Sequence, residues 1–243
     1  MKTNFKAETV LDLLLNAAKN NPSKIYCKSA NHEFTYESFI SACMKLSREI
    51  SQQKLKNERI GILLPNSILF LITYFAILIS GNKPALLNYL LPDFALGKLI
   101  DSLDPSLLIS DKALPKNKSI TVEIEDYLDL QASPIHEIEH NLESEDVAAI
   151  LFSGGTTGIP KQINHSNKCI TLMVNRMEWG WPTNLNEKWL VVAPFTHIYG
   201  FLTGVTNPLL KSGTVFIPDS FDPKLIVEKL NSEEITVFGG GPP

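Results

Sequence analysis

Residues 60–80 read IGILLPNSILFLITYFAILIS and carry no charged side chain over 21 positions. The tripeptide Pro65-Asn66-Ser67 divides them into a strand-length block and a helix-length block, Ile68–Ile79. The second block is apolar on every face, which is typical of a fully buried helix. A strand, a turn and a buried helix in succession predict one unit of a layered α/β domain.

The same 21 residues are long enough to cross a bilayer, so a membrane-bound protein is the alternative interpretation. Such a protein would depend on detergent because of this stretch. Proline and asparagine at its centre would leave backbone groups unsatisfied in lipid, which favours the buried α/β unit. We therefore expect no membrane partner.

Strand-like and helix-like blocks alternate on both sides of this unit. The alternation predicts an α/β fold of two layered, mostly parallel sheets with helices on both faces. Strands are expected at 25–27, 59–64, 84–87, 106–110, 120–124, 147–152, 190–193, 214–217 and 235–238, and helices at 9–19, 36–53, 68–79, 93–102, 167–178, 201–210 and 223–230.

One region, 111–145, interrupts the alternation with Lys, Pro, Ser and acidic residues. The sequence therefore predicts a first α/β sub-domain at 1–110, a connector at 111–145 and a second α/β sub-domain at 146–243. The chain ends on Gly239-Gly240-Gly241-Pro242-Pro243, a composition that marks a turn into a following element. We therefore expect the second sub-domain to be truncated.

The segment 151–161 reads LFSGGTTGIPK, after a predicted buried strand and before a predicted helix. Its glycines let the backbone turn sharply and bring N–H groups close to an anion. Its hydroxyls add donors, and its lysine adds a positive charge. This combination suits a triphosphate, although an ordinary Gly/Thr turn is the alternative. The predicted phosphate-binding residues are Ser153, Gly154, Gly155, Thr156, Thr157, Gly158 and Lys161.

Two common nucleotide motifs do not fit this loop. A Walker A loop needs four residues between its glycines and a lysine directly after the second. Here three residues separate Gly154 from Gly158, and Ile159-Pro160 precede the lysine. The spacing also differs from the GxGxxG fingerprint of dinucleotide-binding domains.

The segment Phe152–Lys161 resembles the glycine- and threonine-rich signature of the adenylate-forming superfamily. That family includes acyl- and aryl-CoA synthetases, luciferases and the adenylation domains of peptide synthetases. The family's usual pattern is an aromatic residue, then Thr-Ser-Gly, Ser or Thr, Thr-Gly, any residue and Pro-Lys-Gly. This chain departs from it with Ser153-Gly154 before the conserved glycine position and Gln162 after the lysine.

Further segments resemble the same family in the same order, so the resemblance covers the whole chain and implies part of the large domain of the acyl-CoA synthetase fold. These segments are Glu33–Glu37, Arg59–Ser67, Ala76–Gly81 and Ala193–Gly200.

The resemblance implies an AMP-forming acid–thiol ligase. Such enzymes join a small carboxylic acid to ATP, release pyrophosphate and pass the acyl group of the acyl-adenylate to a thiol. ATP and Mg²⁺ are the implied cofactors and CoA the implied acceptor. The resemblance also implies that Ser153–Gly158 cradle the β- and γ-phosphates, that Lys161 supports this loop, and that His197 borders the acyl pocket beside Tyr199 and Gly200.

A buried histidine with satisfied hydrogen bonds is the alternative interpretation of His197. The matching context of Pro194 and Gly200 favours the role at the acyl pocket. The form His197-Ile198-Tyr199-Gly200 resembles CoA ligases for aryl-propenoic and fatty acids more than peptide-synthetase domains.

The family's later motifs carry a Thr-Glu pair for magnesium, an aspartate for ribose, a hinge arginine and a catalytic lysine, and none of them occurs in these 243 residues. We therefore expect the chain to be inactive alone, as a truncated product, an excised piece or one half of a split enzyme. Its partner would be a C-terminal half chain or a second copy. The alternative is a non-catalytic module that binds a nucleotide or a partner. An exposed sheet edge is also expected.

Composition excludes several other classes. The formal net charge of −4 leaves no basic footprint for nucleic acid. The odd count of three scattered cysteines favours a reducing compartment, so we expect a cytoplasmic protein.

Three further groups of residues could be mistaken for functional sites. His136–His140 fits the H-E-x-x-H pattern of zinc proteases, but no suitable helix surrounds it. The acidic residues Glu143, Glu145 and Asp146 are expected to solvate the connector. The side chains of Trp179 and Trp181 are expected to be partly buried beside the second sheet.

Overall fold

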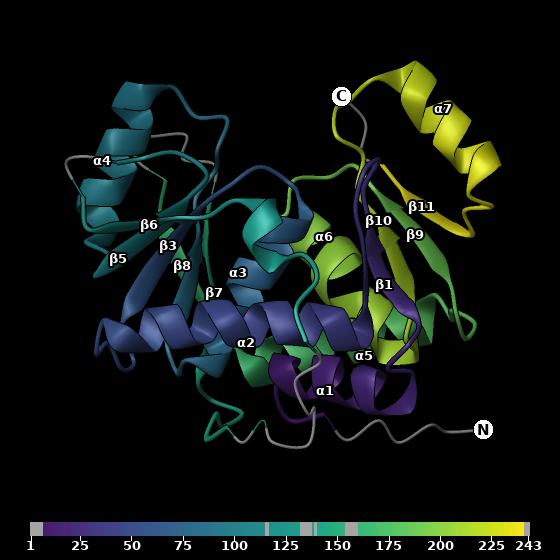
Figure 1. The fold of residues 1–243 in the computed structure, drawn as a ribbon, viewed down its shortest axis with the longest axis horizontal. Coiled ribbons are helices and arrows are strands. Elements are labelled where there is room, and N and C mark those ends of the chain that lie inside the picture. Colours follow the sequence, from purple (N-terminus) through teal and green to yellow (C-terminus); the bar gives the residue numbers. More distant parts are fainter. Residues whose placement is uncertain (1–6, 115–116, 132–137, 139, 154–159, 241–243) are drawn as a thin grey trace.

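The computed structural model describes residues 7–114, 117–131, 138, 140–153 and 160–240 (Figure 1). Two sheets stand side by side, and every strand pairing is parallel except β1 with β2 and β7 with β8. Their orders are β11-β9-β10-β1-β2 and β6-β5-β3-β4-β7-β8. The predicted α/β fold of mostly parallel sheets is confirmed.

Most elements lie close to their predicted positions, but the strands at Glu33–Thr35 and Gln162–Ser166 were not predicted. The strands are β1 Ile25–Lys28, β2 Glu33–Thr35, β3 Arg59–Leu63, β4 Lys83–Leu86, β5 Leu107–Ser110, β6 Ser119–Thr121, β7 Val147–Phe152, β8 Gln162–Ser166, β9 Lys188–Val191, β10 Thr214–Phe216 and β11 Val237–Gly239. The helices are α1 Val10–Asn20, α2 Tyr36–Gln52, α3 Ile68–Ile79, α4 Asp93–Leu103, α5 Asn167–Gly180, α6 Ile198–Phe201 and α7 Pro223–Ser232.

Side-chain caps explain where several helices begin. Thr9, Thr35, Ser67 and Ser166 precede α1, α2, α3 and α5, and each hydroxyl accepts a hydrogen bond from a backbone N–H in the first turn. These donors have no partner inside the helix, so a capping oxygen at this position stabilises it by about 1 kcal/mol. The chain direction into each helix is therefore set locally.

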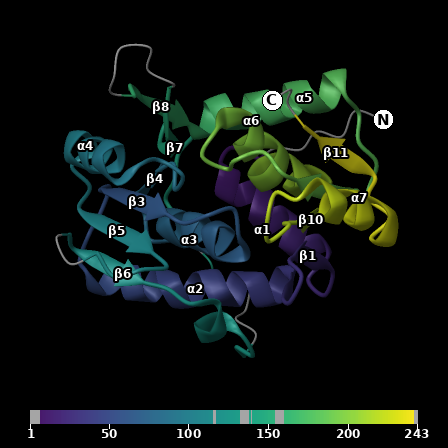
Figure 2. The ribbon, with the colours of Figure 1, turned by 90° about the horizontal axis from the view of Figure 1, so that it is seen from above.

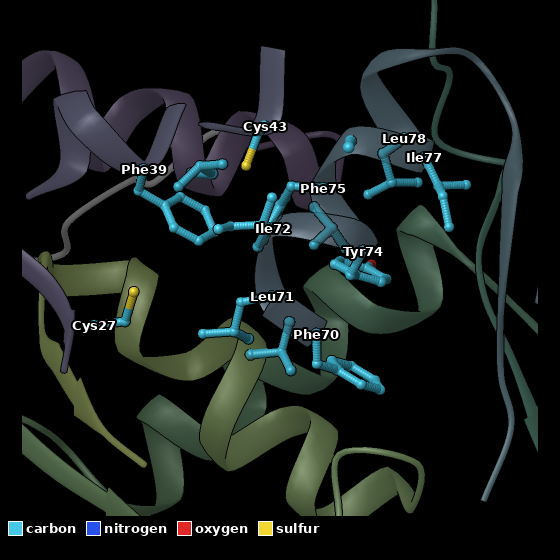
Figure 3. Close-up of a cluster of buried hydrophobic side chains, with 14 of the residues drawn as sticks. Cys27, Phe39, Cys43, Phe70, Leu71, Ile72, Tyr74, Phe75, Ile77 and Leu78 are labelled. Carbon is cyan, nitrogen blue, oxygen red and sulfur yellow. The ribbon is translucent and has the colours of Figure 1, made fainter. Parts of the chain in front are cut away.

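Helix α3 forms the centre of the hydrophobic core, between the two sheets (Figures 1 and 3). Ten of its twelve side chains are buried. The Tyr74 hydroxyl donates a hydrogen bond to the carbonyl of Ala148 over 3.0 Å, and the ring centroid of Phe70 lies 5.2 Å from that of Phe195. The helix thus contacts residues from both halves of the chain, as its all-round apolar surface predicts.

Helix α2 runs along both sheets on one side of the molecule, with α1 beside it (Figures 1 and 2). Burial raises the pKa of the Cys27 and Cys43 thiols, which face this core. All three cysteines are free. Among the residues that the structure describes, no helix has the length and apolar character needed to cross a membrane.

Strand pairing crosses the predicted connector in both sheets. Strand β1 pairs with β10, so that Cys27 lies opposite Val215, while β7 and β8 complete the sheet of β3–β6. Periodicity identifies strands but contains no information about which strand pairs with which. The division of the chain at 111–145 stays a prediction.

Two local predictions are wrong. The glycine-rich loop leads into an antiparallel strand, β8, and not directly into a helix. The helix expected at 201–210 is divided among α6, a π-helical turn at Leu202–Thr206 and a 3₁₀ turn at Asn207–Lys211. Pro208 lacks the N–H that a continuous α-helix would need at this point.

Candidate functional site

A cleft of about 1350 Å³ lies where the carboxyl ends of strands from both sheets face each other. It is bounded by Asn88 after β4, Ser153 after β7 and the segment 192–197 after β9. In open α/β sheets, ligands bind outside the carboxyl ends of the strands. The other lining side chains are mostly apolar, and they include Leu99 from α4, Phe221 just before α7, Ile226, Val227 and Leu230 from α7, and Phe238 from β11.

Asn66 ties the two sheets together beside this cleft. Its side-chain nitrogen donates to the carbonyl of Ala193 over 2.8 Å, and its side-chain oxygen accepts from the N–H of Phe195 over 2.8 Å. Both polar atoms of this one side-chain amide, in the turn after β3, therefore bind the backbone of the loop after β9. The loop leads directly to His197, so this contact fixes the backbone that positions the histidine.

His197 is exposed and lines the cleft, which contradicts the interpretation of a buried histidine. Its Nδ1 accepts a hydrogen bond from the N–H of Tyr199 over 3.3 Å and caps α6. In the neutral ring the proton is therefore on Nε2, the nitrogen left free to donate.

Gly200 allows α6 to start close to the preceding loop. A Cβ at this position would lie 2.1 Å from the carbonyl oxygen of Pro194, which no side chain can tolerate. The glycine is therefore required by the close approach of two backbone segments. Of the residues predicted around His197, Tyr199 lines the cleft directly, and Gly200 is buried behind it.

The predicted phosphate residues Gly154, Gly155, Thr156, Thr157 and Gly158 lie outside the described residues. The two ends of their loop are joined. The N–H of Ser153 donates to the carbonyl of Lys161 over 3.0 Å, and the N–H of Lys161 donates to the Ser153 hydroxyl over 3.3 Å. Ser153 and Pro160 line the cleft, so the loop begins and ends at its wall.

A second pocket, of about 250 Å³, opens beside the cleft. Trp181, Tyr199 and Phe238 line both spaces and form the boundary between them. The Tyr199 side chain packs closely against β11, since a Cβ at Gly239 would lie 2.4 Å from its hydroxyl oxygen.

The prediction that Trp179 and Trp181 are partly buried is wrong. The side chain of Trp179 is 90% exposed and that of Trp181 72% exposed.

One wall of this pocket is polar. The ammonium group of Lys211 contacts both the Glu178 carboxylate and the carbonyl of Thr183. Glu187 is buried, which raises the pKa of its carboxyl, but hydrogen bonds from Thr236 and Asn184 and the charge of Lys211 outweigh burial and lower it. Both carboxylates line the pocket.

The resemblance to a zinc motif has no support here. His136, Glu137 and Glu139 lie outside the described residues. The Nε2–H of His140 donates a hydrogen bond to the Asp12 carboxylate over 3.2 Å, beside the start of α1. Among the described side chains, no group of three His, Cys, Asp or Glu residues could hold a metal ion.

The acidic residues of the connector make local contacts. Glu145 forms an ion pair of 2.8 Å with Lys168, and Asp146 accepts a hydrogen bond from the N–H of Glu143.

The sequence did not point to Glu178, Glu187 or Lys211 as residues of the site. Isolated charges near a helix end or in a loop resemble ordinary surface residues.

Comparison with known proteins identifies the wider group. A profile of the family described as AMP-binding enzyme matches residues 14–243. A 2-succinylbenzoate–CoA ligase of Bacillus licheniformis is 23% identical over 232 residues, which cover 92% of this chain and 48% of the relative. A long-chain-fatty-acid–CoA ligase of Bacillus subtilis is 24% identical over 285 aligned residues, which cover 97% of this chain and 50% of the relative. The chain spans about half the length of these curated relatives.

Solved structures agree on the fold. The o-succinylbenzoate CoA synthetase of Bacillus subtilis, in complex with its acyl-adenylate intermediate, matches with a TM-score of 0.80 and 21% identity, over 95% of this chain and 68% of that one. The same synthetase is also known with AMP, and with ATP and magnesium ion. The N-terminal subdomain of Klebsiella oxytoca NpsA, in complex with 3-hydroxybenzoyl-AMSN, matches with a TM-score of 0.79 and 18% identity, over 96% and 59%.

Proposed function

This chain belongs to the family of AMP-binding enzymes, and from that premise we propose that it is the N-terminal portion of an AMP-forming acid–CoA ligase. It would contribute the site in which a carboxylic acid reacts with ATP to give an acyl-adenylate. The observation that carries the proposal is a single cleft that is lined by His197 and by both ends of the glycine-rich loop.

The residues present fit the nucleotide in chemistry. By sequence, the loop between Ser153 and Lys161 has glycine N–H groups, hydroxyls and one ammonium group to offer, and its described ends, Ser153 and Pro160, line the cleft. Such donors stabilise the charge that develops on transferring phosphates. The proposed phosphate-binding residues remain Ser153, Gly154, Gly155, Thr156, Thr157, Gly158 and Lys161.

Magnesium fits the described residues less well. They offer no cluster of three acidic, His or Cys side chains. We propose that most Mg²⁺ ligands, and the groups that receive CoA, come from sequence that corresponds to the second half of the relatives. When bound, Mg²⁺ would neutralise phosphate charge.

For the acid, we propose that His197 faces the carboxylate and that the second pocket receives the acyl group. The Nε2 proton of a neutral His197 can donate to a carboxylate oxygen and hold it in place, while Nδ1 stays bound to the N–H of Tyr199. Tyr199 and Trp181 then lie along the path from the cleft into the pocket.

We further propose that these 243 residues do not complete the reaction alone and act with a C-terminal half. The proposal is supported by the coverage of about half of each curated relative. A homodimer, which was the other partner considered, has no comparable support. The cytoplasm stays the predicted compartment.

Two measurements on the purified chain test the function. Isothermal titration calorimetry with a stable acyl-sulfamoyl adenosine is expected to show binding, because His197, the start of the glycine-rich loop and the proposed acyl pocket all lie within these residues. ATP–pyrophosphate exchange with aryl and fatty acids is expected to stay at background without the second half.

Lys161→Ala should weaken the binding of ATP, measured by the same calorimetry, by about tenfold, because a positive charge beside the loop proposed to hold the β- and γ-phosphates is lost. Lys168→Ala is the matched control, since Lys168 is equally exposed nearby and pairs with Glu145. Exchange by the chain alone would show that the later sequence is not needed. Absence of any nucleotide or analogue binding would favour a non-catalytic module that binds a partner chain.

A further inference from the structure

The two spaces of the site are joined in a way that orients a bound acid. His197 lines the cleft and not the second pocket, whereas Trp181, Tyr199 and Phe238 line both. An acid whose carboxylate lies at His197 would therefore extend past Tyr199, with its far end in the second pocket. The polar wall of that pocket then decides which far ends are accepted.

The wall carries more negative than positive charge. Glu178 and Glu187 line the pocket, and one ammonium group, that of Lys211, lies beside them. The formal sum is −1. A second carboxylate on the acid would be repelled by this field and would lose hydration on entering a partly buried site.

Two threonine hydroxyls of the pocket can act only as acceptors towards a ligand. The Thr183 hydroxyl donates to Glu178 over 2.7 Å, and the Thr203 hydroxyl donates to the carbonyl of Tyr199 over 2.9 Å. Each hydroxyl has one proton to donate, so both retain only acceptor capacity.

Asn207 lines the pocket but offers a ligand no exposed acceptor. Its side-chain nitrogen lies 3.4 Å from the Met177 sulfur. Its side-chain oxygen is buried and has no hydrogen-bond partner among the described residues. The acceptors considered for a ligand are therefore those of Glu178, Glu187 and the two threonine hydroxyls.

We infer that the second pocket selects carboxylic acids whose far end carries a hydrogen-bond donor, such as an amino or hydroxyl group, and rejects acids with a second carboxylate there. This inference rests on the proposed function, because it concerns the acid activated in the same site. The pocket volume of about 250 Å³ suits a substituted aromatic ring.

A matched set of acyl-sulfamoyl adenosines tests the inference by isothermal titration calorimetry on the 243-residue chain. The set comprises the benzoyl, 3-hydroxybenzoyl, 3-aminobenzoyl and 3-carboxybenzoyl compounds. The hydroxy and amino compounds are expected to bind about tenfold or more tightly than the carboxy compound, since paired and unpaired polar groups differ by this much.

Glu178→Gln provides the variant. It removes one negative charge and leaves Lys211 to attract a carboxylate, so the difference between the amino and carboxy compounds should shrink about tenfold. Glu234→Gln is the control, because Glu234 is exposed, pairs with Lys188 and lines neither space. Thermal denaturation checks that the variants fold. If Glu178→Gln does not fold, the affinities of the four analogues for the unchanged chain test the inference by themselves.

The outcomes separate the two proposals. Equal affinity across the set, or a preference for the carboxy compound, would overturn the selectivity and leave the proposed function standing. Failure of every analogue to bind would overturn both.

Discussion

The side-chain oxygen of Asn66 accepts a hydrogen bond from the backbone N–H of Phe195 over 2.8 Å, across 129 positions of sequence. The same amide donates to the carbonyl of Ala193. One side chain in the turn after β3 therefore fixes the loop that follows β9, a strand of the other sheet. Because His197 lies two residues further on, the geometry of the site depends on this contact.

Asn66→Ala should lower the free energy of unfolding by about 1–3 kcal/mol, because it leaves two backbone groups unpaired. Urea unfolding measures this. Asn231→Ala is the matched control, since its side chain bonds the carbonyl of Val227 on the exposed face of α7. The control should change stability by less than about 0.5 kcal/mol. Equal losses in both variants would show that Asn66 does not hold the sheets together.

Gly200→Ala should destabilise the protein by about 1–3 kcal/mol, because the new Cβ would press on the carbonyl of Pro194. The change should also weaken binding of the adenylate analogue, since α6 carries Tyr199. Gly97→Ala, within α4, has open space around its Cβ and should raise stability by up to about 1 kcal/mol. Opposite signs in thermal denaturation are the expected result, and a neutral Gly200→Ala would contradict the close approach.

Asp12 should make stability depend on pH in the acid range. Partial burial raises the pKa of its carboxyl, but hydrogen bonds from His140 and Thr9 outweigh burial and bring the pKa from 3.8 to about 2. Because the folded pKa is the lower one, the stabilisation is complete above the unfolded value of 3.8. It is lost as the pH falls towards 2.

Asp12→Asn should therefore cost about 1 kcal/mol at neutral pH, after allowance for solvent screening, and progressively less below pH 4. Urea unfolding of both proteins between pH 7 and pH 3 gives the difference. Asp101→Asn, on the exposed side of α4, is the control. A difference that stays constant with pH would mean that the carboxylate contributes nothing through its charge.

Trp181→Ala should weaken binding of an aryl-adenylate analogue by about fivefold or more, because an aromatic wall shared by the cleft and the pocket is removed. The melting temperature should hardly change, since the side chain is 72% exposed. Trp179→Ala is the matched control at the same helix end, and this residue lines neither space. Identical affinities for the two variants in calorimetry would exclude Trp181 from the site.

The sequence determined the elements of this protein. Helix Ile68–Ile79 appears at the predicted bounds, because apolar residues on every face and a capping serine are local features. The strand at Gln162–Ser166 was missed because its local sequence lacks such features. It is a polar edge strand, exposed along most of its length, and shows no apolar alternation.

Only the tertiary structure decided which elements meet. It placed β1 beside β10, brought Asn66 to Phe195 and assembled Glu178, Lys211 and Glu187 around one pocket. Side-chain periodicity reports how each segment divides its surface between core and solvent. Pairing between distant segments depends instead on shape and hydrogen bonding across the whole core, which no single stretch of sequence contains.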